Sequence, residues 1–125
     1  MQNISIVLIT YKSEKVIFNF IKKIPKDIKT IIIENSNNIK MKEEIEENYK
    51  NISVYIKENN GVSSSLNFAS QKINTEYFLQ ISPDIEFNFD DLETFLVLAQ
   101  KLNNKFASIG PRFADVKEKS HKQID

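Results

Sequence analysis

Short apolar segments recur along the chain, separated by stretches with helical periodicity. The apolar segments are rich in β-branched and aromatic residues, which is typical of strands. They span residues 4–9, 30–33, 52–56, 77–81 and 106–109. The first two are apolar nearly throughout, as expected for strands that are buried on both faces of a parallel sheet.

Amphipathic helices are predicted between these strands, at residues 14–24, 41–49, 63–73 and 92–102. The first should begin after a Ser13 cap and end before Pro25, and Phe89 with Asp90 should start the last one. This alternation of strand and helix predicts a three-layer α/β/α domain with a mostly parallel, Rossmann-like sheet.

Polar or aromatic residues follow each of the first four predicted strands. They are Thr10 and Tyr11, Glu34, Asn60 and Gly61, and Asp84. Ligands of such sheets bind outside the carboxyl ends of the strands. The sequence therefore predicts a binding site along that edge.

Two of these residues are acids with distinct candidate roles. Asp84 follows the rigid Ser82-Pro83 step. Its single carboxylate, together with phosphate oxygens, would suit Mg²⁺ or Mn²⁺. The alternative is that Ser-Pro-Asp is only a turn, since Pro and Asp are common in turns. Glu34 can accept hydrogen bonds from a nucleobase or a ribose, or it can be a loop carboxylate or a helix cap.

The other residues offer binding groups of lower specificity. Thr10 carries a hydroxyl, and the ring of Tyr11 is suited to stacking on a nucleobase. Asn60-Gly61 permits positive φ and presents backbone N–H groups to a phosphate or a sugar hydroxyl, but it is also an ordinary turn sequence.

Composition narrows the class of protein. The 125 residues suit one domain, and 17 basic against 17 acidic residues give no field that would attract nucleic acid. The chain has no cysteine, which excludes disulfides and thiolate chemistry and makes the cytoplasm the expected location. No apolar run is long enough to span a membrane, and contact with the inner membrane face is left open. Neither a Gly-x-Gly-x-x-Gly fingerprint nor a Walker loop occurs, which argues against dinucleotide-dependent oxidoreductases and P-loop NTPases.

The segments resemble those of family 2 glycosyltransferases, in particular the rhamnosyltransferase-like branch that builds bacterial surface polysaccharides. In chain order they read ISIVLITYKSEK, IIIENSN, ENNGVSSSLNFA, YFLQISPDIEF and SIGPRF. The resemblance covers nearly the whole chain and implies a truncated GT-A fold, the nucleotide-diphospho-sugar transferase fold.

The resemblance also implies roles for the residues at the predicted site. The base and ribose of a nucleotide-diphosphate sugar would be held by Thr10, Tyr11 and Glu34, and the floor of the site would be shaped by Asn60, Gly61 and Asn67. Asp84 would bind manganese or magnesium. Ser82 stands where the first acid of the Asp-x-Asp metal motif is usual, and Glu34 stands where an Asp is usual.

The reaction implied is sugar transfer with inversion to a glycan or lipid-linked acceptor. Its carboxylate base is expected beyond Asp125. Residues 1–114 are thus expected to form the nucleotide-sugar-binding domain, and residues 115–125 to form a charged tail at the start of an acceptor-binding half. Such a fragment would bind donor without transferring sugar.

Two other readings fit a chain of this size. A receiver-like signalling domain needs acids after its first and third strands and a lysine after its fifth, and this constellation is missing. A non-catalytic binding domain without a working metal site stays open, because Ser82 replaces an acid. Oligomeric state, donor sugar and nucleobase are not predicted.

Overall fold

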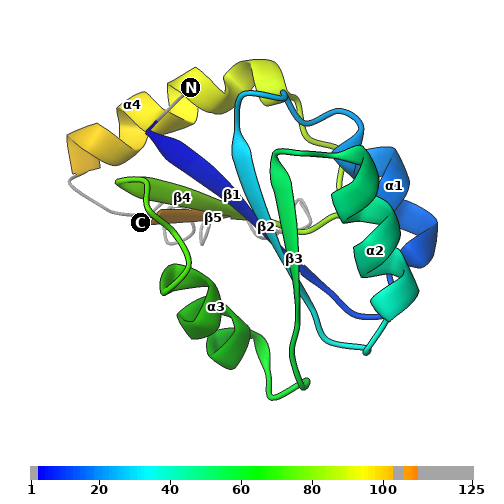
Figure 1. Ribbon diagram of the computed structural model, residues 1–125. Helices are drawn as coiled ribbons and strands as arrows, with labels where there is room; N and C mark the ends of the chain where they lie inside the picture. The colour runs from blue at the N-terminus through cyan, green and yellow to red at the C-terminus, as the bar shows by residue number, and fades with distance from the viewer. Residues whose placement is uncertain (1–2, 103–105, 110–125) are drawn as a thin grey trace.

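A computed structural model describes residues 3–102 and 106–109 of the chain. Its centre is a five-stranded sheet in the order β3-β2-β1-β4-β5, and every pairing is parallel (Figure 1). The strands are β1 (Ile4–Thr10), β2 (Lys29–Glu34), β3 (Ile52–Ile56), β4 (Tyr77–Ile81) and β5 (Phe106–Ile109). The predicted strands are confirmed, and the first two are slightly longer than expected.

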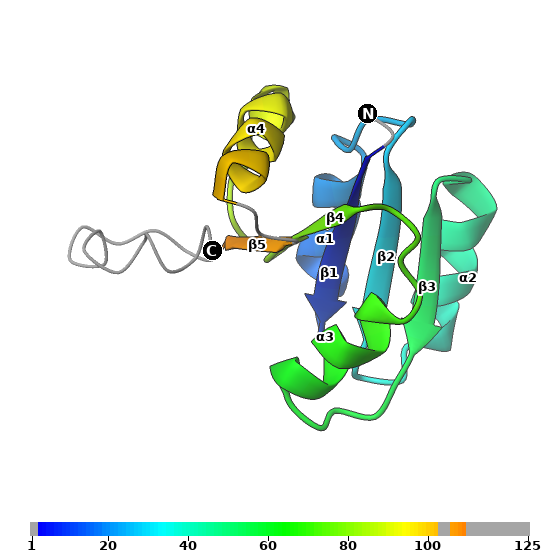
Figure 2. The same ribbon diagram turned by 90° about the vertical axis from the view of Figure 1, so that its left-hand side faces the viewer.

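Helices cover both faces of the sheet, which confirms the three-layer architecture (Figure 2). They are α1 (Glu14–Ile21), α2 (Ile39–Asn48), α3 (Val62–Ser70) and α4 (Leu92–Leu102), with a 3₁₀ turn at Phe89–Asp91 before α4. The helices α1 and α2 lie on one face, and α3 lies on the other.

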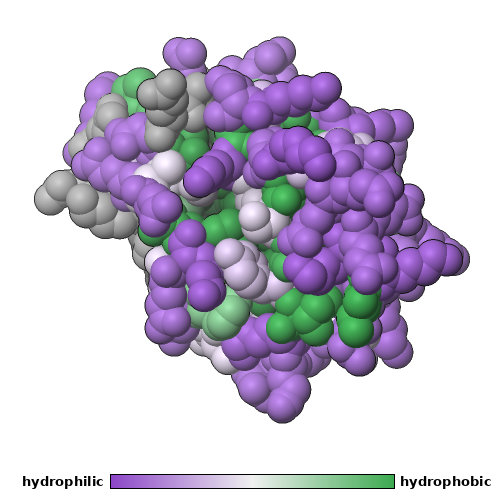
Figure 3. Space-filling model, in the orientation of Figure 1, coloured by the Kyte–Doolittle hydropathy of each residue, from purple (hydrophilic) through white to green (hydrophobic). Residues whose placement is uncertain are grey.

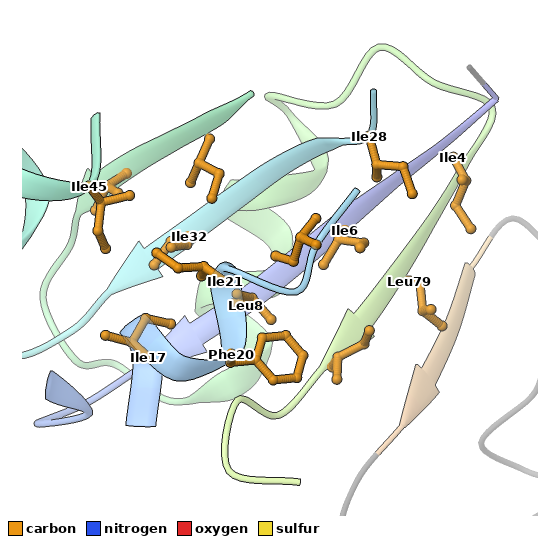
Figure 4. Packing of buried hydrophobic residues seen from close by; sticks show 14 of the residues in the cluster. Ile4, Ile6, Leu8, Ile17, Phe20, Ile21, Ile28, Ile32, Ile45 and Leu79 are labelled. Carbon is orange, nitrogen blue, oxygen red and sulfur yellow. The ribbon is translucent and has the colours of Figure 1, made fainter. Parts of the chain in front are cut away.

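Alternation along β1 divides the core between the two faces. Ile6 and Leu8 belong to the large apolar cluster under α1 and α2, whereas Val7 faces α3. Figure 4 shows the side chains of the large cluster, with Ile17 and Phe20 of α1 close to Leu8. This burial on both faces explains why the strand is apolar nearly throughout.

The segment after β4 adds to the large cluster. Leu92, at the start of α4, is fully buried there. The Phe89 ring packs edge-on against Phe20, with centroids 5.5 Å apart. The loop that follows the candidate metal residue is thereby tied to α1.

Two predicted caps are wrong, and the first helix is shorter than its apolar spacing suggested. Ser13 occupies the N-cap position of α1, but its hydroxyl bonds the backbone of Tyr11 instead of a helical N–H. The helix ends at Ile21, before Pro25, in a turn where the Ile24 N–H bonds the Ile21 carbonyl at 3.1 Å. The side chain of Asn88, not that of Asp90, caps the turn before α4 by accepting from the Asp90 N–H at 2.9 Å.

The expected domain end at residue 114 and the expected tail at 115–125 lie outside the described residues. In the part of the chain that is described, no helix has the length and apolar character needed to cross a membrane.

Candidate functional site

The carboxyl ends of four strands meet at one edge of the sheet. Thr10 pairs with Glu34, and Glu34 pairs with Ile56, so β1, β2 and β3 end level with one another. The register of β4 places Gln80 beside Val7, so β4 ends at the same edge. The predicted site residues Thr10 and Glu34 are the last residues of β1 and β2. The others lie in the connections after β1, β3 and β4 or, in the case of Asn67, on the helix α3 that follows β3.

Glu34 is the centre of a buried hydrogen-bond network at this edge. Its side chain is 0% exposed. One carboxylate oxygen accepts from the Thr10 hydroxyl at 2.6 Å. The other accepts from the Ser36 N–H and hydroxyl at 2.7 and 2.6 Å, and from the Asn38 N–H at 3.0 Å. The carboxylate thus joins the end of β1 to the loop after β2.

These bonds decide the protonation state of Glu34. Burial acts to raise the pKa of a carboxyl group, but the hydrogen bonds from Ser36, Thr10 and Asn38 together outweigh it, and the pKa of Glu34 is lowered. The group is therefore a carboxylate at neutral pH, held entirely by donors of the protein.

Tyr11 and Lys12 lie next to this network and are exposed to solvent. Tyr11 is 52% exposed, although it directly follows the fully buried Thr10. Lys12 has a φ of +52°, and its N–H donates to the Ser36 hydroxyl at 3.0 Å. Because that hydroxyl itself donates to Glu34, the Tyr11-Lys12 step is tied to the buried carboxylate.

Asn35 is a further residue of the site that the sequence did not single out. It is nearly buried, and its side chain donates to the Lys57 carbonyl at 3.0 Å and accepts from the Ser65 hydroxyl at 3.1 Å. Its backbone N–H donates to the Thr10 carbonyl at 2.8 Å. One residue thus connects the ends of β1 and β3 and the helix α3, although its position in a run of polar loop residues indicated only a turn.

Asn60, Gly61 and Asn67 are exposed beside the other half of the edge. Gly61 has a φ of +97° and immediately precedes α3. The ammonium group of Lys57 donates to the Ser64 hydroxyl at 2.7 Å, which places a positive charge near the first turn of that helix. Backbone N–H groups and a cation in this arrangement suit an anionic ligand.

Asp84 lies in the turn after β4, where its carboxylate accepts from the Ser82 hydroxyl at 2.5 Å. Pro83 between them is buried, and Asp84 is exposed. Among residues 3–102 and 106–109, no three His, Cys, Asp or Glu side chains are grouped as a metal site. The residues present therefore fit an ion that shares Asp84 with phosphate oxygens, and do not fit an ion held by protein carboxylates alone.

Exposed apolar side chains border the same edge. The large ones in the described part are Tyr11, Ile39, Val62 and Val97. The first three follow the ends of β1, β2 and β3. Figure 3 shows apolar patches on a surface that is otherwise mostly hydrophilic. Apolar groups beside fixed polar groups suit a ligand that has both a ring and polar substituents.

A separate hollow of about 380 Å³ lies at the opposite edge of the sheet. It is lined by Asn3, Ile4, Asp27, Lys29, Asn74, Thr75 and Glu76, which flank the amino ends of β1, β2 and β4. None of the predicted site residues lines it, so it is distinct from the carboxyl-end site.

Comparison with known proteins assigns the family. The model of the glycosyl transferase family 2 matches residues 5–124, which is nearly the whole chain. No match was found among curated proteins. A family match of this extent agrees with the parallel α/β sheet and with polar residues after its strands, and the chain belongs to glycosyl transferase family 2.

Proposed function

We propose that this chain binds a nucleotide-diphosphate sugar, the donor of a glycosyltransferase, at the carboxyl ends of β1 to β4. The observation that supports the proposal is that Tyr11, Glu34, Gly61 and Asp84 end or follow parallel strands whose carboxyl ends lie at one sheet edge, in a family 2 chain. Open α/β sheets bind their ligands at this edge.

In the proposed complex, the Tyr11 ring stacks on the nucleobase, because it is exposed and its backbone is fixed from both sides. Thr10 and Glu34 contribute indirectly to binding of the base and ribose. Since both side chains are fully buried and bonded to each other, they act by holding the loops after β1 and β2 in place.

The diphosphate and sugar are assigned to the other half of the edge. Asn60, Gly61 and Asn67 would form the floor of the site, with the Lys57 ammonium group close to the start of α3. A positive charge beside the first turn of a helix favours a diphosphate.

Asp84 is assigned to a manganese or magnesium ion, with the Ser82 hydroxyl bonded to the same carboxylate. When bound, such an ion neutralises charge on the departing diphosphate. Because the protein offers a single carboxylate here, we expect the ion to bind together with the nucleotide and only weakly without it.

At the level of the parent enzyme, the proposal is transfer with inversion to a glycan or lipid-linked acceptor, in the rhamnosyltransferase-like branch. The base stays assigned to residues beyond Asp125. This chain then supplies the donor side of the reaction.

The first test is calorimetric titration with uridine, guanosine and deoxythymidine diphosphates, each with and without Mn²⁺. We expect one of them to bind, and Mn²⁺ to tighten binding on the order of tenfold, or about 1.4 kcal/mol. Asp84→Ala should remove the Mn²⁺ effect. Asp91→Ala, which removes another exposed acid from the same connection, should not.

The second arm of that titration concerns Tyr11. Tyr11→Ala should weaken binding by about 1–3 kcal/mol, the range for loss of a base-stacking ring, while Tyr11→Phe retains the affinity. Failure of all three nucleotides to bind would reject the proposed function. Binding that is insensitive to both Mn²⁺ and Asp84→Ala would reject the metal assignment alone.

A further inference from the structure

The outer edge of β3 carries a main-chain feature unrelated to the proposed function. β3 is the end strand of the sheet, with α2 beside it (Figure 2). The Asn51 carbonyl accepts from the Thr30 N–H, and the Lys57 N–H donates to the Glu34 carbonyl. The odd-numbered residues of this segment therefore point their main-chain groups toward β2. The main-chain groups of Ile52, Val54 and Ile56 consequently point outward.

Such outward groups are a template for pairing with another strand, and proteins block them in several ways. Here two side chains of α2 bond the central residue. The Lys42 ammonium group donates to the Val54 carbonyl at 2.8 Å, and the Val54 N–H donates to the Glu46 carboxylate at 2.8 Å. Beside them, the Ile52 N–H donates to the Tyr49 carbonyl at 3.3 Å.

Lys42 and Glu46 also bond each other, at 2.9 Å, as an i,i+4 pair. For an isolated helix the stabilising order is Glu followed by Lys, and this pair has the reverse order. The contacts of Lys42 and Glu46 with β3 require this order. The earlier residue, Lys42, bonds the Val54 carbonyl, and the later residue, Glu46, bonds the Val54 N–H, as in a helix that runs antiparallel to β3. A cation must therefore come first and an anion second.

We propose that Lys42 and Glu46 form an edge guard, which keeps a second copy of this chain from pairing with the outer edge of β3. The second copy is the expected partner because two such edges are identical and short, and each presents the same outward residues in reverse order when related by a two-fold axis. The guard occupies both groups of the central residue that this pairing would need.

The sharpest test exchanges the two residues in the double variant Lys42→Glu and Glu46→Lys. The exchange keeps net charge and the ion pair, and it gives α2 the order that favours a helix. It places an acceptor against the Val54 carbonyl and a donor against the Val54 N–H, so the guard is lost. The matched control exchanges the exposed pair Lys40 and Glu44 on the same helix, as Lys40→Glu with Glu44→Lys.

Sedimentation equilibrium across a range of concentrations measures self-association, and circular dichroism reports folding. We expect the average mass of the exchanged variant to rise with concentration toward that of a dimer, beyond that of the wild-type chain and the control. A folded exchanged variant that sediments as the wild-type chain does would overturn the proposal.

Two further variants keep the test decisive. Lys42→Ala leaves the Glu46 bond in place and should show weaker association of the same kind, so its outcome decides the question if the exchanged variant does not fold. Adding Ile56→Pro to the associating variant removes an outward N–H and should restore the monomer. Association that persists in folded protein after this change would show contact through another surface and contradict the proposal.

Discussion

Glu34 shows how one residue can combine a charge with complete burial. A carboxylate removed from water is costly unless hydrogen bonds replace its solvation. Thr10, Ser36 and Asn38 supply four such bonds, of which two come from backbone N–H groups. The cost of burial is thereby offset, and the loops after β1 and β2 are held to a common centre.

This network predicts acid sensitivity. The pKa of Glu34 is lower in the folded chain than its ordinary value of 4.5. A carboxyl group with a lowered folded pKa stabilises the fold above its unfolded pKa, and this contribution is lost as the pH falls through the folded pKa. Stability should therefore decrease below about pH 4.5, measured as the urea midpoint at each pH.

Glu34→Gln tests that origin. A Gln carbonyl can still accept from Ser36 and Asn38, and the Thr10 hydroxyl can rotate to accept from the amide. We expect a loss on the order of 1–3 kcal/mol at pH 7 from the missing charge, and a flatter dependence on acid pH. Stability should still depend to some extent on acid pH, because the pKa of Glu46 is also lowered. Burial acts to raise the pKa of Glu46, but the hydrogen bonds from Val54 and Lys42 outweigh this effect.

The exposed Glu44→Gln is the matched control, since it removes a carboxylate from the same half of the chain. It should leave both the midpoint at pH 7 and the acid dependence nearly unchanged. Equal acid profiles for the Glu34→Gln variant and the wild-type chain would contradict the assignment of the transition to Glu34.

Local hydrogen-bond choices at single polar residues were the least predictable part of the site. Glu34 could be placed at a strand end from the sequence, because three isoleucines precede it. Whether its carboxylate would face a ligand or the protein depends on Thr10, which is remote in the chain. Asn35 was not singled out, and the cap bond of Ser13 was wrongly predicted, for the same reason: their partners lie across the sheet or in a turn, where sequence spacing carries no information.

At the scale of elements, the strands could be predicted nearly to the residue and the helix ends could not. A buried strand such as β4 is a short apolar run with sharp polar boundaries. The end of a helix depends on competition between weak local bonds. The helix α3 ends at Ser70, although the apolar spacing continues to Ile73, because the next N–H groups bond in tighter turns to Phe68 and Ala69.

Gly61 sets the start of α3 through its backbone alone. Its φ of +97° and ψ of 165° lie in a region that is essentially restricted to glycine. A Cβ at this position would meet nothing within 4 Å, so the effect of a substitution is purely conformational. Gly61→Ala should lower the free energy of unfolding by about 1–3 kcal/mol, measured by urea denaturation.

The exposed Ser63→Ala on the first turn of α3 is the control, and should change stability by less than about 0.5 kcal/mol. The same Gly61→Ala variant should bind a nucleoside diphosphate more weakly if Gly61 contributes to the site. Unchanged stability would show that the turn tolerates a side chain and that α3 can start differently.

At the scale of the whole molecule, the two faces of the sheet are buried to different extents. On one face, α1 buries Ile17, Phe20 and Ile21, and α2 buries Met41 and Ile45. On the other, α3 buries only Ser65 and Ala69. Buried apolar area largely decides how strongly an element is held, so α3 is the weaker layer.

The proposed donor site includes this weaker layer, and that leads to a prediction about its opening. Gly61 and Asn67 belong to the start and the body of α3. The backbone amides of α3 should exchange with solvent through a local opening whose free energy lies below that of global unfolding. The amides of α1 should exchange with a free energy closer to that of global unfolding. Native-state hydrogen exchange, followed by NMR at low urea concentrations, measures both.

The same experiment connects stability with binding. A nucleoside diphosphate that contacts α3 binds the closed form and should slow exchange there by the factor 1 + [L]/Kd, about a hundredfold at a ligand concentration of 100 Kd. Amides of α1 that open independently of the site should change less. Exchange in α3 as slow as that in α1 without ligand would show that Asn35 and Lys57, through Ser65 and Ser64, hold this helix more firmly than its apolar burial indicates.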